Sequence, residues 1–177
     1  MPDDSNESLF KKQKAIKPTP EDIAGEIENG DDLRNLMDFL GFLRENKLSP
    51  RWQSSNTWSV RYRNKAVCHL RVNYNEKGWR VSNRHFVWEK WFEGDDKYIT
   101  DDDLKGFILD NIRGPVCVNT GCKGVENVTI MGKGFDSVCG CWPHSVLNPG
   151  GAEFDCLKKL ILAIKAYIAD FAAASKV

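Results

Sequence analysis

The sequence lacks several features that would place it at once in a class of proteins. It has no run of about 18 apolar residues, so we expect no membrane-spanning helix. Its first ten residues, MPDDSNESLF, open with acids and contain no apolar core, so we expect no secretory signal and a cytoplasmic location. There is no internal repeat, and 41% hydrophobic residues exclude a disordered chain. These absences leave a soluble globular protein of 177 residues.

The sequence also lacks the common motifs of enzymes. It contains no GxGxxG after a strand, no GxSxG and no HExxH, and the GKG at residues 132–134 lacks the spacing of a P-loop. The three histidines, His69, His85 and His144, are too scattered to predict a catalytic triad. We identify no catalytic residue and no cofactor-binding motif, and these absences favour a binding domain without excluding an enzyme.

Hydrophobic periodicity predicts an α+β fold. Helices are expected near residues 20–46, where Thr19 can cap the first helix and Pro20 suits its first position. Alternation of apolar and polar residues then predicts an antiparallel β-meander over 57–84, packed by helices. A further helix is expected at 101–112. A Cys-rich loop and hairpin segment follows, with the hairpin near 128–138, and a long C-terminal helix closes the chain.

The same pattern predicts how the chain is organised. Residues 1–18 are polar and are expected to be a disordered tail. Residues 19–112 are expected to form the α+β core domain. Residues 113–177 are expected to add the Cys-rich segment and a C-terminal helix packed on that core.

The cysteines carry the strongest prediction of a site. Cys68 and Cys156 fall at apolar positions of predicted elements, so we interpret them as small buried hydrophobes. The other four are grouped, and loops could bring their thiolates together for tetrahedral Zn²⁺ in a structural clasp. The predicted zinc ligands are Cys117, Cys122, Cys139 and Cys141.

Other interpretations of this cluster stay open. His144 could replace one of the four ligands, and the thiols could instead bind no metal. Cys139 and Cys141, separated by one glycine, could form a strained disulfide or capture a soft metal or metalloid. A thiol-based redox or metalloid-responsive protein that uses these two cysteines is therefore the alternative function.

The charges are segregated along the chain, although 25 basic and 25 acidic side chains cancel. Residues 51–92 carry 9 basic and 2 acidic side chains, and strand alternation gathers many of them on one face of the meander. The residues of that face are Arg61, Arg63, His69, Arg71, Arg80 and Arg84. Two interpretations explain this pattern. The basic side chains could lie on a sheet face exposed to solvent, or the acidic side chains of residues 95–103 could neutralise their charge. Nucleic-acid binding is not expected, because most aromatic residues lie on the opposite face.

Aromatic residues suggest two further surfaces. A cleft for a small planar or apolar ligand could be rimmed by Trp58, Tyr62, Trp79, Trp88 and Trp91, although tryptophans also serve as core residues. The last helix, around Tyr167 and Phe171, could belong to a protein-interaction module. Our leading interpretation is a non-catalytic cytosolic domain that binds a small ligand or a protein and carries a structural zinc clasp.

The stretch from Trp58 to Cys68, preceded by the Leu-rich helix and by Pro50-Arg51-Trp52, resembles a bacterial domain family of unknown function. That family has a helix before a W-x-[LV]-R-Y-[RK] strand and a following strand that ends in cysteine. The resemblance covers about residues 20–92 and implies a small α+β domain, distantly similar to YdhG/YjbR-type folds. The later Cys-rich segment looks like tails of clostridial proteins, and the resemblance implies no catalytic residue.

Overall fold

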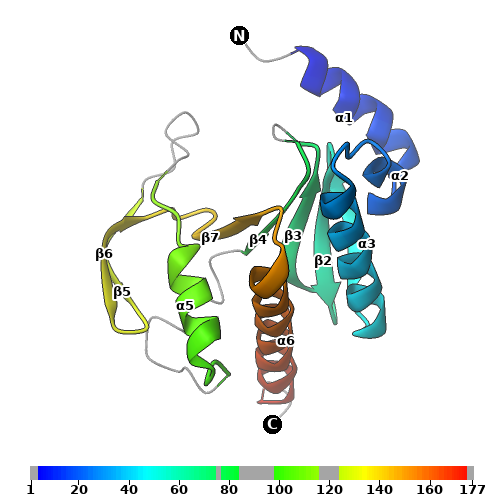
Figure 1. Ribbon diagram of the computed structural model, residues 1–177. Coiled ribbons are helices and arrows are strands. Elements are labelled where there is room, and N and C mark those ends of the chain that lie inside the picture. Colours follow the sequence, from blue (N-terminus) through cyan, green and yellow to red (C-terminus); the bar gives the residue numbers. More distant parts are fainter. Residues whose placement is uncertain (1–3, 75–76, 84–97, 116–123, 175–177) are drawn as a thin grey trace. The chain divides into compact units, whose positions relative to one another are not determined.

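The computed structural model describes residues 4–74, 77–83, 98–115 and 124–174, and it confirms the α+β class (Figure 1). Antiparallel strands form a sheet in the order β1-β2-β3-β4-β7, and β5 pairs with β6 in a separate hairpin. The helices are α1 (Asp4–Ile16), α2 (Pro20–Ala24), α3 (Gly30–Glu45), α5 (Asp102–Asp110) and α6 (Gly151–Ala174). The strands are β1 (Ser49–Ser54), β2 (Thr57–Tyr62), β3 (Lys65–Val72), β4 (Trp79–Asn83), β5 (Val125–Ile130), β6 (Lys133–Val138) and β7 (His144–Leu147).

The chain divides into two units, which differ from the expected 19–112 and 113–177. Unit 1 contains Met1–Val81 together with Leu147–Gly150, and unit 2 contains Ser82–Val146 and Gly151–Val177. The short second piece of unit 1 is fixed by polar contacts. Asn148 donates its backbone N–H to the Trp79 carbonyl at 2.8 Å, and Asn35 donates to the Pro149 carbonyl at 3.3 Å. Such contacts between distant residues leave no trace in a periodicity pattern.

The core of unit 1 forms where α3 packs on one face of the meander. The apolar residues of α3 recur at helical spacing, and its buried residues are Leu36, Phe39, Leu40 and Leu43. On the sheet, Trp58 and Trp79 are each 1% exposed, and the Phe39 and Trp79 rings lie 5.3 Å apart. The buried indole of Trp58 also donates to the Pro18 carbonyl at 2.7 Å, which satisfies its only polar group.

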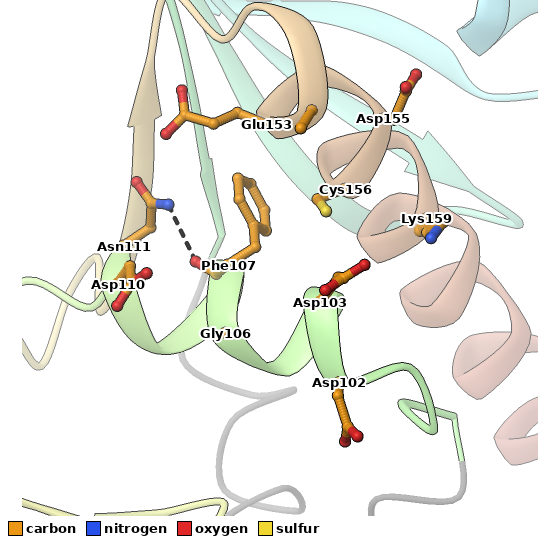
Figure 2. Close-up of a pocket in the computed structure, with 11 residues that line it drawn as sticks. Asp102, Asp103, Gly106, Phe107, Asp110, Asn111, Glu153, Asp155, Cys156 and Lys159 are labelled. Atoms are coloured by element: carbon orange, nitrogen blue, oxygen red, sulfur yellow. Dashed lines mark hydrogen bonds between the residues drawn. The ribbon is translucent and has the colours of Figure 1, made fainter.

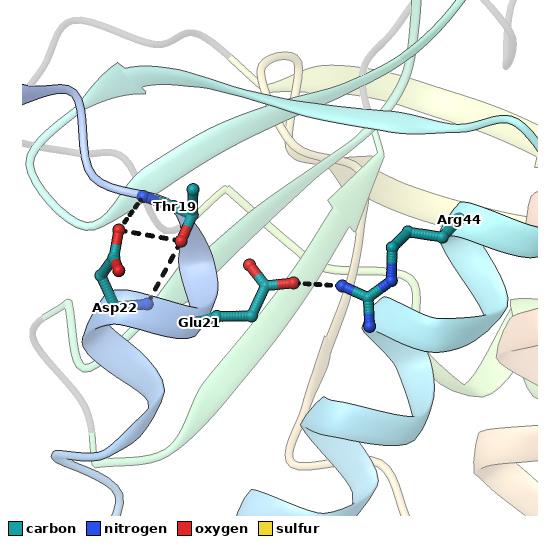
Figure 3. Close-up of polar contacts among 4 residues, drawn as sticks. All are labelled: Thr19, Glu21, Asp22 and Arg44. Carbon is teal, nitrogen blue, oxygen red and sulfur yellow. Dashed lines mark hydrogen bonds and ion pairs between the residues drawn. The ribbon is translucent and has the colours of Figure 1, made fainter.

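The start of α2 confirms the predicted cap (Figure 3). The Thr19 hydroxyl accepts from the Asp22 backbone N–H at 3.3 Å, and the Asp22 carboxylate accepts from the Thr19 backbone N–H at 2.7 Å. These reciprocal bonds form a capping box, with Pro20 in the first helical position. An ion pair between Glu21 and Arg44 then ties α2 to the end of α3.

The segment expected to be a disordered tail contains α1. Its Gln13 is only 4% exposed and bridges to the turn between β1 and β2. The Gln13 side chain donates to Asn56 Oδ1 at 2.5 Å and accepts from the Asn56 backbone N–H at 2.8 Å. The Phe10 ring stacks on Trp52 at 5.8 Å. The correction follows from contacts about 40 residues apart along the chain, which the local polarity of α1 could not reveal.

Two asparagines clamp the turn between β3 and β4. The Asn73 side chain accepts from the Gly78 backbone N–H at 2.9 Å, and Asn148 Oδ1 accepts from the Trp79 backbone N–H at 2.7 Å. Gly78 has φ +96°, a conformation that side chains disfavour. A Cβ atom at Gly78 would lie 2.2 Å from Asn148 Oδ1. The turn therefore requires glycine for both its conformation and its space.

Replacing Gly78 by alanine is expected to lower the free energy of unfolding by about 2–3 kcal/mol, because the new methyl group displaces Asn148. Gly41 in α3 is the matched control, since an added Cβ there meets no atom within 4 Å. Gly41→Ala is expected to raise stability by about 0.5–1 kcal/mol. Urea unfolding curves of the two variants measure both changes. Equal unfolding midpoints for Gly78→Ala and the unaltered protein would contradict the clamp.

Unit 2 contains the β5–β6 hairpin and the helices α5 and α6. Buried Val128, Ile130 and Val138 of the hairpin form an apolar cluster, against which Leu109 and Ile112 pack. The cap of α5 is Asp101, which accepts from the backbone N–H groups of Asp103 and Leu104 at 2.9 and 3.2 Å. Asp101 also pairs with Lys159, so the cap connects α5 to α6. In the described part of the chain, no helix is both long and apolar enough to cross a membrane.

Candidate metal centre

The β5–β6 hairpin places Cys139 at its open end. Val125 pairs with Val138, so Cys139 leaves β6 directly beside the start of β5. The Cys139 backbone N–H donates to the Arg113 carbonyl at 2.8 Å. Arg113 follows α5, so this bond joins the segment before residue 116 to the end of the hairpin.

Pro115 and Gly124, which flank residues 116–123 in the sequence, also lie close together beside β6. A Cβ atom built on Gly124 would lie 3.1 Å from Pro115 Cβ and 2.5 Å from the hydroxyl oxygen of Ser137. Gly124 therefore lies against both Pro115 and β6, with no room for a side chain. Because Gly124 has no side chain, its backbone can lie directly against Pro115.

Each of the four cysteines lies close in the sequence to one of these contacts. Cys117 follows Pro115 by two residues, Cys122 precedes Gly124 by two, and Cys141 follows Cys139 by two. Gly124 lies against Pro115, and Cys139 is hydrogen-bonded to Arg113. A tetrahedral zinc site with Zn–S bonds of about 2.3 Å needs four sulfurs close together, and this sequence spacing is compatible with one.

Of the four predicted ligands, the structure describes Cys139 and Cys141, while Cys117 and Cys122 lie outside the described residues. Cys139 is buried at 1% exposure, and Cys141 is exposed. The Trp142 backbone N–H donates to Cys139 Sγ at 3.4 Å. Hydrogen bonds of this kind orient ligating groups in metal sites. Within the described residues, no three His, Cys, Asp or Glu side chains are grouped to hold a metal ion, so the complete clasp stays a prediction.

His144, the possible replacement ligand, contacts Asn83 and Phe107 in unit 2. Its side chain is completely buried, its Nδ1 lies 3.2 Å from Asn83 Oδ1, and its ring packs edge-on against Phe107 at 5.6 Å. Burial lowers the pKa of His144 to about 3, so the imidazole is neutral at physiological pH. His144 begins β7, and these contacts connect it to Asn83 of β4 and to Phe107 of α5, so its role is structural.

The remaining two cysteines are buried, as predicted. Cys68 is 1% exposed on the core face of β3, and burial raises the pKa of its thiol. Cys156 is 9% exposed in the first part of α6, and its thiol pKa is also raised, mainly by burial. Because thiols with raised pKa values are poor nucleophiles and poor metal ligands, both serve as controls for the cluster.

A groove of about 610 Å³ lies between α5 and α6 (Figure 2). Phe107 and Cys156 lie within it, and five carboxylates and the ammonium of Lys159 line it. The carboxylates are those of Asp102, Asp103, Asp110, Glu153 and Asp155. Asp102 and Asp103 begin α5, and Glu153 begins α6, where the helix dipole favours acids. Helix-terminal electrostatics thus account for much of the charge of this groove, and no motif in the sequence indicates that these two helices meet.

The residues of the expected aromatic cleft occupy different environments. Trp58 and Trp79 are core residues at 1% exposure each, Tyr62 is half-buried, and Trp88 and Trp91 lie outside the described residues. The two described tryptophans therefore stabilise unit 1 and present almost no surface to a ligand. On α6, the rings of Tyr167 and Phe171 stack at 6.4 Å, and Phe171 is 54% exposed.

Comparison of the chain with protein-family models, with curated proteins and with solved structures found no match. The resemblance of the Trp58–Cys68 stretch to a bacterial family therefore stays a prediction.

Proposed function

We propose that the protein is a non-catalytic binding domain in which a structural zinc ion, held by Cys117, Cys122, Cys139 and Cys141, closes unit 2. The observation that supports this proposal is the meeting of Arg113, Pro115, Gly124 and Cys139 at one end of the hairpin. Zinc bound there by four thiolates has no open coordination position, so it stabilises structure and does no chemistry.

A cytoplasmic location belongs to the same proposal. Four thiolates bind zinc only while they stay reduced, and a reducing compartment keeps them so. The hairpin gains most from the metal, because two strands with a small apolar cluster are marginally stable by themselves. The clasp would join the segment after α5 to both strands.

Single serine substitutions of the four cysteines test which residues hold the metal. We expect each variant to lose most of the bound zinc, because an alcohol replaces a thiolate ligand. Cys156→Ala is the matched control and is expected to retain about one zinc per chain, since that thiol lies in another part of unit 2. Elemental analysis of each purified variant gives the result. Zinc that survives in all four serine variants would contradict the ligand assignment.

The alternative function is a thiol-based redox or metalloid-responsive protein. The observation that favours it is the turn at Cys139–Cys141, where a buried cysteine and an exposed one are separated only by Gly140. Two thiols so close could bind trivalent arsenic or another soft ion. Protein purified without metal that binds arsenite with loss of two thiols would support this alternative over the clasp.

A further inference from the structure

The helix α1 carries an exposed surface that the zinc clasp does not involve. Between residues 8 and 17 the chain has four lysines and no Asp or Glu. One side of α1 packs on β1 and the turn after it, through Phe10 and the buried Gln13. The opposite side is exposed, and together with the residue after the helix we call it the lysine face. It consists of Lys11, Lys12, Lys14, Ala15, Ile16 and Lys17.

The lysine face combines positive charge with exposed apolar surface. Ile16 is 73% exposed, more than any other large hydrophobic side chain in the described ranges. Among the residues that the structure describes, no carboxylate pairs with Lys12, Lys14 or Lys17. One exposed apolar residue is ordinary by itself, but this one is surrounded by cations that lack counter-charges. A partner surface that is acidic at its rim and apolar at its centre would complement both features.

The groove between α5 and α6 has this complementary composition, and we call it the acidic groove. Its floor contains Phe107 and Cys156, whose side chains lie between the two helices (Figure 2). Carboxylates surround this floor, with Asp110 and Glu153 at one end and Asp155 at the other (Figure 2). Its volume of about 610 Å³ is enough to admit large side chains of a partner.

Most of the negative charge of the acidic groove is not neutralised within the molecule. Lys159 lines the groove, but its ammonium pairs with Asp101, which is not a lining residue. In the described part of the chain, no cation pairs with Asp103, Asp110, Glu153 or Asp155. Asp110 also lies in the last turn of α5, where the helix dipole disfavours a carboxylate. Helix capping therefore does not explain all of these acids, and a cationic partner would stabilise them.

We propose that the lysine face of one copy of the chain docks in the acidic groove of a second copy. The chain itself supplies both complementary surfaces, so each copy presents the partner that the other requires. Ile16 then covers the apolar floor at Phe107, while the lysines meet the carboxylates around it. Because two different surfaces meet, the contact is head-to-tail, and each added copy leaves one groove and one lysine face open. Association therefore continues beyond the dimer.

Analytical ultracentrifugation of the full chain over about 20–500 μM tests the proposal. In about 50 mM salt, half of the unaltered protein is expected to be associated at roughly 100 μM, because the contact is small and polar. In about 500 mM salt the association is expected to weaken at least about 10-fold, since salt screens exposed charges. Protein that stays monomeric at every concentration in low salt would overturn the proposal.

Two double variants test the two surfaces separately. Lys12→Gln/Lys14→Gln alters only the lysine face, and Asp110→Asn/Glu153→Gln alters only the acidic groove. Each variant alone is expected to associate about 3- to 10-fold more weakly than the unaltered protein. Their equimolar mixture is expected to associate as tightly as the unaltered protein but to stop at the dimer. The groove of the first variant still accepts the lysine face of the second, and no intact pair of surfaces then remains.

Lys65→Gln and Asp38→Asn are the matched controls, because both side chains are exposed and lie outside the two surfaces. They are expected to leave the association unchanged. Ile16→Ser is expected to weaken it about 5- to 10-fold without changing any charge, and circular dichroism checks that every variant is folded. Association that both double variants leave unchanged would overturn the proposal. So would a mixture that associates no better than its components, or controls that weaken association as much as the double variants.

Discussion

Removing zinc with a chelator is expected to unfold the Cys-bearing end of unit 2 while unit 1 stays folded. Structural zinc contributes an apparent free energy of about 10–16 kcal/mol in small peptides, more than a two-stranded hairpin supplies by itself. The bond from the Cys139 N–H to the Arg113 carbonyl reports on this region. Amide exchange at Cys139 and along β5–β6 is expected to accelerate at least about 100-fold after chelation.

Unit 1 supplies the internal control for this experiment. The amides of β2 and β3, which belong to unit 1, are expected to keep their protection in the same sample. Cys139→Ser is expected to reproduce the effect without a chelator, and Cys156→Ala is expected not to reproduce it. Unchanged exchange along β5–β6 after complete removal of metal would contradict a structural role for zinc.

Acidification is expected to destabilise the protein through His144. Burial lowers the pKa of His144 to about 3 from an ordinary value of 6.5, so the unfolded chain takes up this proton at a higher pH than the folded chain. Between about pH 6.5 and pH 3 the unfolded state binds more protons, and stability falls as the pH falls. The loss attributable to His144 is about 2 kcal/mol between pH 7.5 and pH 5.

His144→Gln isolates this contribution, because glutamine can hydrogen-bond to Asn83 but does not titrate. The difference in unfolding free energy between the unaltered protein and this variant is expected to shrink as the pH falls from 7.5 to 5. Asp101→Asn is the contrasting variant. The hydrogen bond from Lys159 lowers the pKa of the Asp101 carboxyl. The contribution of this carboxylate to stability is therefore lost only as the pH falls below the ordinary value of 3.8. Parallel pH curves for His144→Gln and the unaltered protein would contradict the assignment.

Elements set by local chemistry were predictable from the sequence. The Thr19 cap, the apolar stripe of α3, the meander and the hairpin all follow from residues close together in the chain. Cys68 and Cys156 were correctly interpreted as buried for the same reason, because each falls on the apolar side of its element.

Elements set by distant contacts were not predictable. α1 depends on Gln13 and Asn56, which are 43 residues apart. The edge strand β1 contains Pro50 and has no fully buried residue, so it lacks the pattern of a strong strand. β7 has only four residues, and it pairs where Asn148 meets Trp79. The contacts of Gly124 with Pro115 and of Cys139 with Arg113 were likewise hidden, because the spacing of the cysteines in the sequence does not show which distant residues meet.

The most direct test of the zinc clasp is elemental analysis of freshly purified, untagged protein, combined with thiol titration before and after chelation. We expect about one zinc per chain and four thiols that react only once the metal is removed, while the buried Cys68 thiol stays unreactive until the chain unfolds. Protein without zinc, whose Cys139 and Cys141 react at once, would contradict the clasp and favour thiol chemistry at that turn.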